Sequence, residues 1–321
     1  MGLLTRPRPD LPKPAQTGRK TPEIGAFCRI PEYDRTVRTR TKPAIDRRDG
    51  VSVVIPAFNE VQGIERCLRE TVDAMESVGT PFEVILVDDG SEDQTAEFAV
   101  ELARQIPHVR VVGANRNAGK GAALVQGGLI ARYPLVLFVD ADLEIHPRQV
   151  TVLLDRMEAE QADVVIGSKM HPDSKVDYPT ERRMLSVGYY LLVRLLFRLP
   201  VHDTQTGLKL YRRELLQEVL PRLVVKRFAM DLELLVTAHR HGAKIVEAPV
   251  VVTRERPFGR IGKSDVRNVA QDTAAIWYRT YILRYYDRPM TRWEELTPVE
   301  RATPPPADAE TGTGTGTGTA A

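Results

Sequence analysis

The sequence has few cysteines, no long apolar segment and almost no excess of one charge. Two cysteines among 321 residues, Cys28 and Cys67, lie far apart and offer neither the spacing of a metal site nor a disulfide framework, which fits a reducing compartment. No run of about 18 apolar residues is present, so no helix is expected to span a bilayer. A net charge of +2 is too small to favour nucleic acid as a partner, and any basic surface must be local.

The two ends of the chain differ in composition from its middle. The first residues lack the apolar core of a signal peptide, which predicts a protein on the cytoplasmic side. Residues 1–49 are rich in Pro, Arg and Thr without sustained periodicity, and we expect an irregular arm. Residues 291–321 include a Pro-rich stretch and a Gly-Thr repeat, which predict a disordered low-complexity tail. The folded region is therefore expected between residues 50 and 290.

Hydrophobic patterning in the folded region alternates between strands and helices. The strands predicted in the first half are 51–55, 82–87, 109–112 and 135–139, separated by helices 65–78, 94–106 and 121–133. The second half is predicted to contain strands 163–168 and 244–252 and helices 180–199, 230–241 and 266–286. This spacing predicts an α/β fold, Rossmann-like, with a mostly parallel sheet and helices on both faces. In such sheets ligands lie beyond the carboxyl ends of the strands.

Carboxylates gather where the fourth predicted strand ends. Asp140 and Asp142 point the same way from an extended backbone, and Glu144 follows two residues later. Such an oxygen-rich edge suits Mg²⁺ or Mn²⁺ held partly by the protein and partly by the phosphates of a ligand. The alternative is a polar loop that caps the next helix.

Other polar and small residues follow the second and third strands. Asp88 and Asp89 can accept hydrogen bonds from a base or ribose, or they can cap a turn. The stretch Gly113–Gly121 does not match a P-loop, because Gly121 stands where Ser or Thr should be, and the G-x-G-x-x-G pattern is absent after the first strand. ATPase and NAD-dependent activities are therefore disfavoured. Small residues at 117–121 still open a helix, so backbone amides can approach a nucleotide or form a plain turn.

Taken in order, these segments resemble the family 2 inverting glycosyltransferases of GT-A fold. The matching motifs are Pro56-x-Phe58-Asn-Glu60, Val87-Asp-Asp-Gly-Ser91, Asn117-x-Gly-Lys-Gly121 and Asp140-Ala-Asp142. The second half is similar to the dolichyl-phosphate hexosyltransferases in the motifs Gly167-Ser-Lys169, Arg182-Arg-x-x-Ser186, Asp203-Thr-Gln-Thr-Gly207-Leu-Lys209, Phe228-Ala-Met-Asp231-Leu-Glu233 and Arg254-Glu-Arg256. The resemblance covers residues 50–265, the predicted catalytic domain, and is closer to the glucosyl than to the mannosyl branch.

The resemblance implies inverting transfer of a hexose from a nucleotide sugar, UDP-glucose before GDP-mannose, to a polyprenyl or dolichyl phosphate. It assigns Asp140, Asp142 and Glu144 to a metal ion, Mg²⁺ or Mn²⁺. The residues implied for the nucleotide sugar are Pro56, Ala57, Phe58, Glu60, Asp89, Gly119, Lys120, Asp140 and Ala141. Three residues depart from the family pattern: Phe58 replaces a Tyr, Glu144 replaces the Gln of the mannosyl branch, and Lys169 replaces an Arg, which removes a bidentate phosphate contact.

An acceptor phosphate is already an anion, so the reaction needs cations to position it rather than a strong base. The residues predicted to bind this phosphate are Lys169, Arg182, Ser186 and Lys263. Arg182 and Ser186 lie one helical turn apart, and Arg256 and Lys263 lie in a glycine-rich segment that could close as a lid. The residues assigned to catalysis are Asp142, Asp231 and Arg256. Asp231 and Glu233 either orient the acceptor or form structural ion pairs with Arg227 or Lys209.

Two helices have compositions that suit a membrane interface, although each could instead pack on the sheet. In helix 180–199 one face is expected to carry Leu185, Tyr189, Leu192, Leu196 and Leu199, opposite Arg194 and Arg198. The segment 266–290 is rich in Trp, Tyr and Arg. We therefore expect a peripheral enzyme on the cytoplasmic face of a membrane, with a membrane protein as a candidate partner. A glycosyltransferase with a soluble acceptor and a non-catalytic nucleotide-sugar-binding protein are the alternatives.

Overall fold

The structure is a computed structural model, and it describes residues 43–114, 116–176, 180–226, 229–253 and 263–288. The side chains of residues 180–185 and 263–266 are not described. Most of the predicted arm, the predicted tail and the catalytic candidate Arg256 therefore lie outside the described residues. The side chains of two acceptor candidates, Arg182 and Lys263, also lie outside them.

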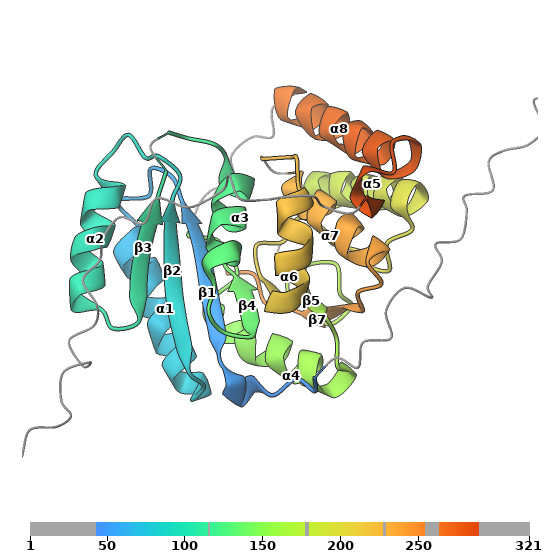
Figure 1. Cartoon of the computed structure of the whole chain (residues 1–321). Helices are drawn as coiled ribbons and strands as arrows, with labels where there is room; N and C mark the ends of the chain where they lie inside the picture. The colour runs from blue at the N-terminus through green and yellow to red at the C-terminus, as the bar shows by residue number, and fades with distance from the viewer. Residues whose placement is uncertain (1–42, 115, 177–179, 227–228, 254–262, 289–321) are drawn as a thin grey trace, which may run out of the picture. The chain divides into compact units, whose positions relative to one another are not determined.

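Seven strands form one mixed sheet, shown in Figure 1. They are β1 (Val51–Ala57), β2 (Phe82–Asp88), β3 (Val109–Gly113), β4 (Leu135–Phe138), β5 (Val164–Ser168), β6 (Lys209–Arg212) and β7 (Ile245–Pro249). Their order across the sheet is β3-β2-β1-β4-β6-β5-β7, and all neighbours are parallel except β6, which is antiparallel to β4 and β5. The mostly parallel α/β fold that the sequence predicts is confirmed. β6 was not predicted, because its Lys209 and Arg212 interrupt the apolar pattern that marks a buried strand.

Eight α-helices surround the sheet in the described residues. They are α1 (Ile64–Val78), α2 (Thr95–Gln105), α3 (Lys120–Ile130), α4 (Val150–Glu160), α5 (Thr180–Phe197), α6 (Arg213–Val219), α7 (Met230–Arg240) and α8 (Lys263–Trp277). The final predicted helix, 266–286, is shorter than expected. A π-helical turn (Tyr278–Ile282) follows α8, and Arg284 then adopts a left-handed conformation with φ 47°, which ends the helix.

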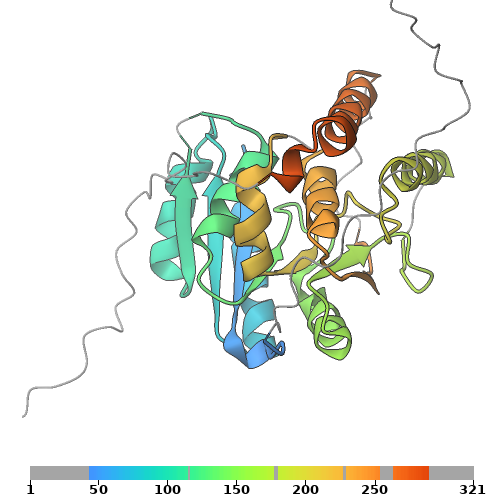
Figure 2. The ribbon, with the colours of Figure 1, turned by 45° about the vertical axis from the view of Figure 1, so that its right-hand side comes forward.

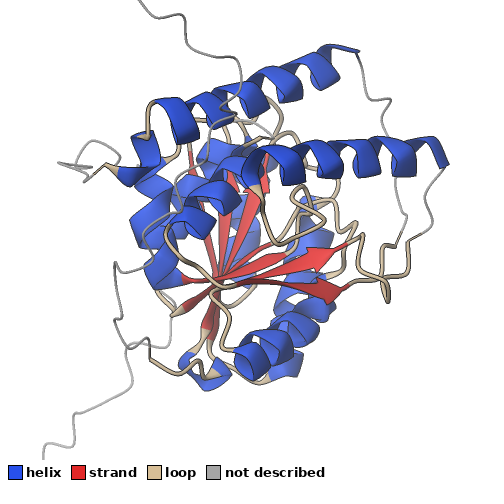
Figure 3. Cartoon of the chain, turned by 90° about the vertical axis from the view of Figure 1, so that its right-hand side faces the viewer, coloured by secondary structure: helices blue, strands red, loops and turns tan. Residues whose placement is uncertain are grey.

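Helices cover both faces of the sheet, as Figure 3 shows. Alternate side chains of a strand point to opposite faces, so the central strands contribute to two hydrophobic layers. Val53 and Val84 pack in the layer that includes α1, α2 and α4, whereas Val54 and Ile85 pack in the layer that includes α3 and α5 to α8. In Figure 2, α6 and α7 lie near each other on this second side. Because both faces are covered, the carboxyl edge of the sheet is left as the place for a site.

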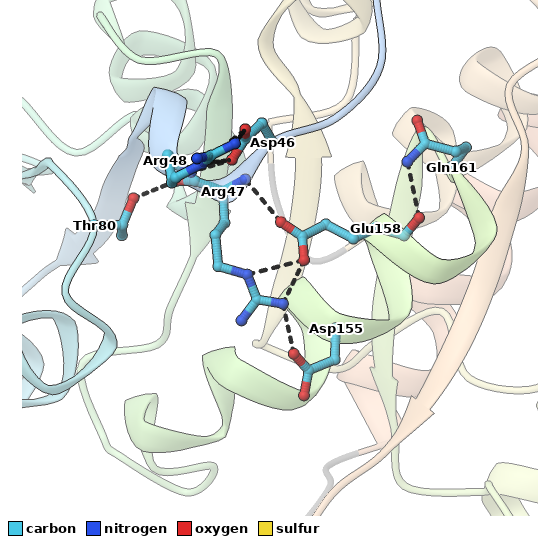
Figure 4. A network of polar contacts seen from close by, with 7 residues as sticks. All are labelled: Asp46, Arg47, Arg48, Thr80, Asp155, Glu158 and Gln161. Atoms are coloured by element: carbon cyan, nitrogen blue, oxygen red, sulfur yellow. Dashed lines mark hydrogen bonds and ion pairs between the residues drawn. The ribbon is translucent and has the colours of Figure 1, made fainter.

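The segment before β1 is fastened to α4 by the polar network in Figure 4. Arg47 donates from its backbone N–H to Glu158 Oε1 over 2.8 Å and from its guanidinium to Glu158 Oε2 and Asp155 Oδ1. Its neighbour Arg48 pairs only locally, with Asp46. No local sequence pattern predicts this contact, because it joins residues more than 100 positions apart.

Apolar side chains are exposed on α5 and after α8. On α5 the exposed residues are Val187, Leu191, Leu192 and Leu195, and after α8 they are Tyr278, Ile282, Leu283 and Tyr285, with Trp277 at the last position of α8. Among the described residues, no helix is both long enough and apolar enough to cross a membrane. The face predicted for helix 180–199 is partly wrong: Leu199 is buried and Leu196 packs against the core, while Leu192 is exposed beside Leu191 and Leu195.

Candidate active site

The candidate site lies at the carboxyl ends of β1, β2 and β4, which are neighbours because β1 pairs with both of the others. The loops after β1 and β2 are joined by Asn59. Its backbone N–H donates to Ser91 Oγ over 2.9 Å, and its side-chain oxygen accepts from the backbone N–H of Glu92 over 2.9 Å. Asn59 has φ 56°, a conformation that Asn tolerates better than most residues. Of the predicted nucleotide residues on this side, Phe58 is exposed while Pro56 and Ala57 are buried in β1.

Asp89, at the end of β2, holds the loop that precedes α3. Its two carboxylate oxygens accept from the backbone N–H groups of Ala118 and Gly119 over 2.9 and 2.7 Å. Burial raises the pKa of Asp89, and these two hydrogen bonds oppose that shift. The next residue, Gly90, lies so close to this loop that a Cβ there would overlap the backbone of Arg116. Asp89 therefore fixes the position of Gly119 and of Lys120, the first residue of α3.

Lys120 and Asp140 form the central ion pair of the site. Lys120 Nζ lies 2.6 Å from Asp140 Oδ1. Burial disfavours the Lys120 ammonium, but the charges of Asp140 and Asp231 outweigh it and raise the pKa of Lys120. Burial likewise disfavours the Asp140 carboxylate, yet Lys120, followed by Lys209 and Lys169, lowers the pKa of Asp140. Both groups are therefore charged near neutral pH.

Glycine at position 207 makes room for the Asp140 carboxylate. A Cβ at Gly207 would overlap Asp140 Oδ2, so the loop before β6 closes directly over this side chain. The sequence motif contains Gly207, but it did not reveal this contact, since Gly207 precedes β6 and Asp140 follows β4.

Asp142 and Glu144 are directed to different partners. Asp142 is exposed, and its Oδ1 accepts from the backbone N–H of Glu144 over 3.0 Å. Partial desolvation of the carboxyl group, followed by the charge of Asp140, raises the pKa of Asp142 even though the residue is exposed. Leu143 between them has φ 56°, which turns the chain sharply. Glu144 Oε2 instead meets Lys169 Nζ over 2.6 Å.

The three carboxylates therefore do not converge as the sequence predicts. Across the described part of the chain, no group of three His, Cys, Asp or Glu residues is placed to share a metal ion. A pair of carboxylates is nevertheless a sufficient protein contribution for Mg²⁺, which commonly takes one or two carboxylates together with substrate phosphates. Asp140 and Asp142 supply hard oxygen ligands of that kind, and Asp142 is exposed at the edge of the sheet. The residues present thus fit a metal held jointly with a diphosphate.

Asp231 lies in the first turn of α7 and forms an ion pair with Lys209 of β6. Both residues are buried, and Lys209 Nζ also donates to the carbonyl of Thr206 over 2.7 Å. Of the two roles that the sequence left open, the ion pair with Lys209 is thus present. The charge of Asp231 also contributes to the raised pKa of Lys120.

Glu233 is a structural carboxylate. It is fully buried and accepts from the backbone N–H groups of Val224 and Val225 over 2.9 and 2.7 Å, from Arg279 over 3.1 Å and from the Tyr286 hydroxyl. These bonds join α7 to the C-terminal segment. An acceptor-orienting role for Glu233 is therefore wrong, since a ligand does not reach it.

A cleft of about 450 Å³ adjoins the carboxylates on the side of α5. Lys169 lies in its lining and also reaches Glu144, so this lysine connects the cleft to the carboxylate edge. The polar lining includes Ser186, another acceptor candidate, and the apolar lining includes Tyr189, Tyr190 and Val193 of α5. The backbone N–H of Lys169 donates to Asp203 Oδ2 over 3.0 Å, which fixes its position.

Sequence reasoning missed one polar pair at this cleft. His202 Nδ1 lies 2.7 Å from Glu247 Oε2 of β7, and the His202 ring packs near Tyr190 with centroids 4.9 Å apart. No spacing signal joins His202 to Glu247, because they lie 45 residues apart.

The mostly parallel sheet, with aspartates at its carboxyl edge, a lysine at the start of α3 and a cleft alongside, has the architecture of the GT-A glycosyltransferases. The chain belongs to glycosyl transferase family 2, whose sequence profile matches residues 52–220.

Several curated relatives share this region. Glycosyltransferase AglD of Haloferax volcanii is 35% identical over 216 residues, which are 66% of this chain and 35% of AglD. The chain therefore spans about a third of the length of AglD. Dolichyl-phosphate beta-glucosyltransferase ALG5D of Trichomonas vaginalis is 33% identical over 251 residues, 74% of this chain and 76% of the relative. Undecaprenyl-phosphate mannosyltransferase of Micrococcus luteus is 30% identical over 239 residues, 71% of this chain and 96% of the relative.

Solved structures share the fold. Glucosyl-3-phosphoglycerate synthase from Mycobacterium tuberculosis, crystallised with Mn²⁺, UDP-glucose and phosphoglyceric acid, superposes with a TM-score of 0.53 at 21% identity. The match covers 76% of this chain and 81% of that chain. At this identity the likeness establishes the GT-A fold of the chain.

Proposed function

We propose that this protein transfers a hexose, with inversion, from a nucleotide sugar to a polyprenyl or dolichyl phosphate at a membrane surface. UDP-glucose is the favoured donor and GDP-mannose the next. The observation that carries the proposal is the position of Lys169, which contacts the carboxylate edge through Glu144 and lines the partly apolar cleft beside it. A phosphate bound at Lys169 would lie between the carboxylate edge and the cleft.

The donor would lie along the carboxyl edge of β1, β2 and β4. Asp140 and Asp142 would hold a Mg²⁺ or Mn²⁺ ion, which supplies charge neutralisation to the leaving diphosphate. We propose that Gly119, Lys120 and Ala141 contact the diphosphate, with the Lys120 ammonium, which is paired with Asp140, as its cation. The residues proposed for the remainder of the nucleotide sugar are Pro56, Ala57, Phe58, Glu60 and Asp89.

The acceptor would enter through the cleft beside α5. Its phosphate would meet Lys169 and Ser186, with Arg182, Arg256 and Lys263 as further proposed contacts. Apolar side chains such as Val193 and Tyr189 offer a surface for the first isoprenoid units. Because the phosphate oxygen is already an anion, it can attack the anomeric carbon without first giving up a proton.

The environment of Asp231 also favours a phosphate acceptor over a hydroxyl. A hydroxyl acceptor would require a general base, and Asp231 is the carboxylate available for that role. Its carboxylate is instead already engaged by the ammonium of the buried Lys209. We therefore assign Asp231 an electrostatic and orienting role near the acceptor.

Membrane contact is proposed for the exposed apolar side chains of α5 and of the segment after α8. Leu191 and Leu195 are more than half exposed, at 56% and 76%, and Arg194 and Arg198 lie beside them on the solvent side. Apolar side chains flanked by arginines suit the boundary between acyl chains and phosphate headgroups. A peripheral position on the cytoplasmic face, with a membrane-protein partner, completes the proposal.

The test is transfer of radiolabelled sugar to a short polyprenyl phosphate by the purified full-length protein. UDP-glucose, GDP-mannose and other common nucleotide sugars are supplied in turn, with Mn²⁺, Mg²⁺ or a chelator. We expect metal-dependent labelling from one donor, and a loss of about 100-fold or more in Asp142→Asn, since the metal contributes several kcal/mol to such reactions. No labelling from any donor would refute the proposal. Labelling of phosphoglyceric acid in place of the lipid would establish the soluble-acceptor alternative.

A further inference from the structure

The Lys120 ammonium is bound to a carboxylate oxygen of Asp140 that a metal ion would need as a ligand. Its Nζ lies 2.6 Å from Asp140 Oδ1, and the other oxygen of Asp140 is faced by Gly207. By contrast, no ion pair joins Asp142 to any of the described residues. A divalent cation that binds both aspartates must therefore contend with the Lys120 ammonium for Asp140.

The backbone that carries Lys120 is fixed, while its side chain can still move. Asp89 accepts from the N–H of Gly119 just before it, and the N–H of Gly121 just after it donates to the carbonyl of Lys226 over 2.9 Å. The Lys120 side chain is 26% exposed, and its ammonium is carried by four flexible methylenes. Its ammonium can therefore exchange one anion for another within reach of the same helix terminus.

The ammonium groups of the other two lysines near Asp140, Lys209 and Lys169, are less free to move from one anion to another. Lys209 is 1% exposed and is held by Asp231 and by the carbonyl of Thr206. Lys169 lies against Glu144, on the side of the cleft. Lys120 is thus the described lysine that both contacts Asp140 and lies at the start of α3, where the helix dipole already favours a phosphate.

We propose that Lys120 is an exchange residue that couples metal binding to binding of the donor diphosphate. Paired with Asp140, Lys120 opposes a divalent cation at that carboxylate. A diphosphate offers the ammonium a stronger anion, so Lys120 moves to it and releases Asp140 Oδ1. Metal and diphosphate then each strengthen binding of the other, and the coupling is reciprocal by linkage. This inference rests on the proposed function, because it requires a diphosphate-containing donor at the carboxylate edge.

The test measures Mn²⁺ binding directly, by the electron paramagnetic resonance signal of free Mn²⁺, with and without saturating UDP. Wild-type protein is compared with Lys120→Met and Lys120→Gln, which remove the charge, and with Lys120→Arg, which keeps it. Lys226→Met is the matched control. It removes an exposed charge from the segment that contacts the same turn of α3, and Lys226 makes no described ion pair with Asp140.

We expect Lys120→Met and Lys120→Gln to bind Mn²⁺ alone about tenfold more tightly, and to lose about tenfold of the UDP-induced gain in affinity, within the usual range of coupling between sites. Lys120→Arg and Lys226→Met should stay within about threefold of wild type. Unchanged Mn²⁺ affinity in both neutral variants would overturn the inference, as would an equal change in Lys226→Met. If wild-type protein binds neither UDP nor GDP, with or without Mn²⁺, the proposed function fails together with the inference. If wild-type protein binds both and coupling is intact in the neutral variants, the inference alone fails.

Discussion

Removing the Lys209 side-chain charge should strongly destabilise the protein. Lys209 and Asp231 are 1% and 9% exposed at their side chains, and Lys209 also donates to the Thr206 carbonyl. Lys209→Met keeps the volume of the side chain but leaves the Asp231 carboxylate buried without its cation. Breaking one partner of a buried pair costs about 3–5 kcal/mol, so we expect a loss of that size in the free energy of unfolding at pH 7.

A double variant separates the loss of the attraction between Lys209 and Asp231 from the cost of leaving the Asp231 carboxylate buried without a partner. In Lys209→Met combined with Asp231→Asn, no uncompensated charge remains, and stability should recover by about 2 kcal/mol or more relative to Lys209→Met alone. Urea unfolding followed by circular dichroism gives the free energies for all four proteins of the cycle. The reasoning is refuted if Lys209→Met loses less than about 1 kcal/mol, or if the double variant is no more stable than the single one.

The same variants test the chemical role of Asp231. If the acceptor is a phosphate, Asp231→Asn should lose less than about tenfold in kcat, since no proton has to be removed. Loss of a general base typically costs about 100-fold or more, so a decrease of that size would contradict the electrostatic role. Comparison at saturating acceptor separates kcat from KM, which an orienting residue affects differently.

Three further predictions concern the site edge, the N-terminal segment and the lipid-facing surface. Gly207→Ala should reduce donor binding at least tenfold, because the added Cβ overlaps the Asp140 carboxylate, and calorimetric titration with UDP and Mn²⁺ checks this. Arg47→Met should lower the free energy of unfolding by about 1 kcal/mol, because Arg47 forms ion pairs with α4, whereas Arg48→Met, which removes a local pair with Asp46, should lower it less. Hydrogen bonds from Arg47 lower the pKa of Glu158 below its ordinary value of 4.5, so the stability that this pair contributes is present above pH 4.5. Urea unfolding should therefore show the advantage of wild type over Arg47→Met shrinking as the pH falls below that value. Leu195→Ser, in the exposed row on α5, should weaken flotation with anionic liposomes severalfold, and equal flotation would contradict membrane contact there.

Local sequence patterns predicted the elements whose signal is continuous along the chain. The strand before Asp140 is an unbroken apolar run, and the strand that ends at Asp88 is apolar except for Glu83. The helices between them have regular amphipathic spacing, so the parallel half of the sheet and its carboxyl edge were predictable. β6 was not, because burial of Lys209 is favourable only next to Asp231, which lies on a different element. The outward face of α5 was mistaken for a similar reason: apolar residues occur on more than one side of this helix, and their spacing does not indicate which side the rest of the fold covers.

The sequence by itself determined the family, the α/β order and the residue types at the candidate site, since these depend on ordered motifs and on local hydrophobic spacing. Only the tertiary structure decided how those residues are paired. It placed Lys120 on Asp140, Lys169 on Glu144 and Lys209 on Asp231, three ion pairs that join separate elements. Such pairing depends on distance and burial in the folded chain, which a one-dimensional pattern does not contain.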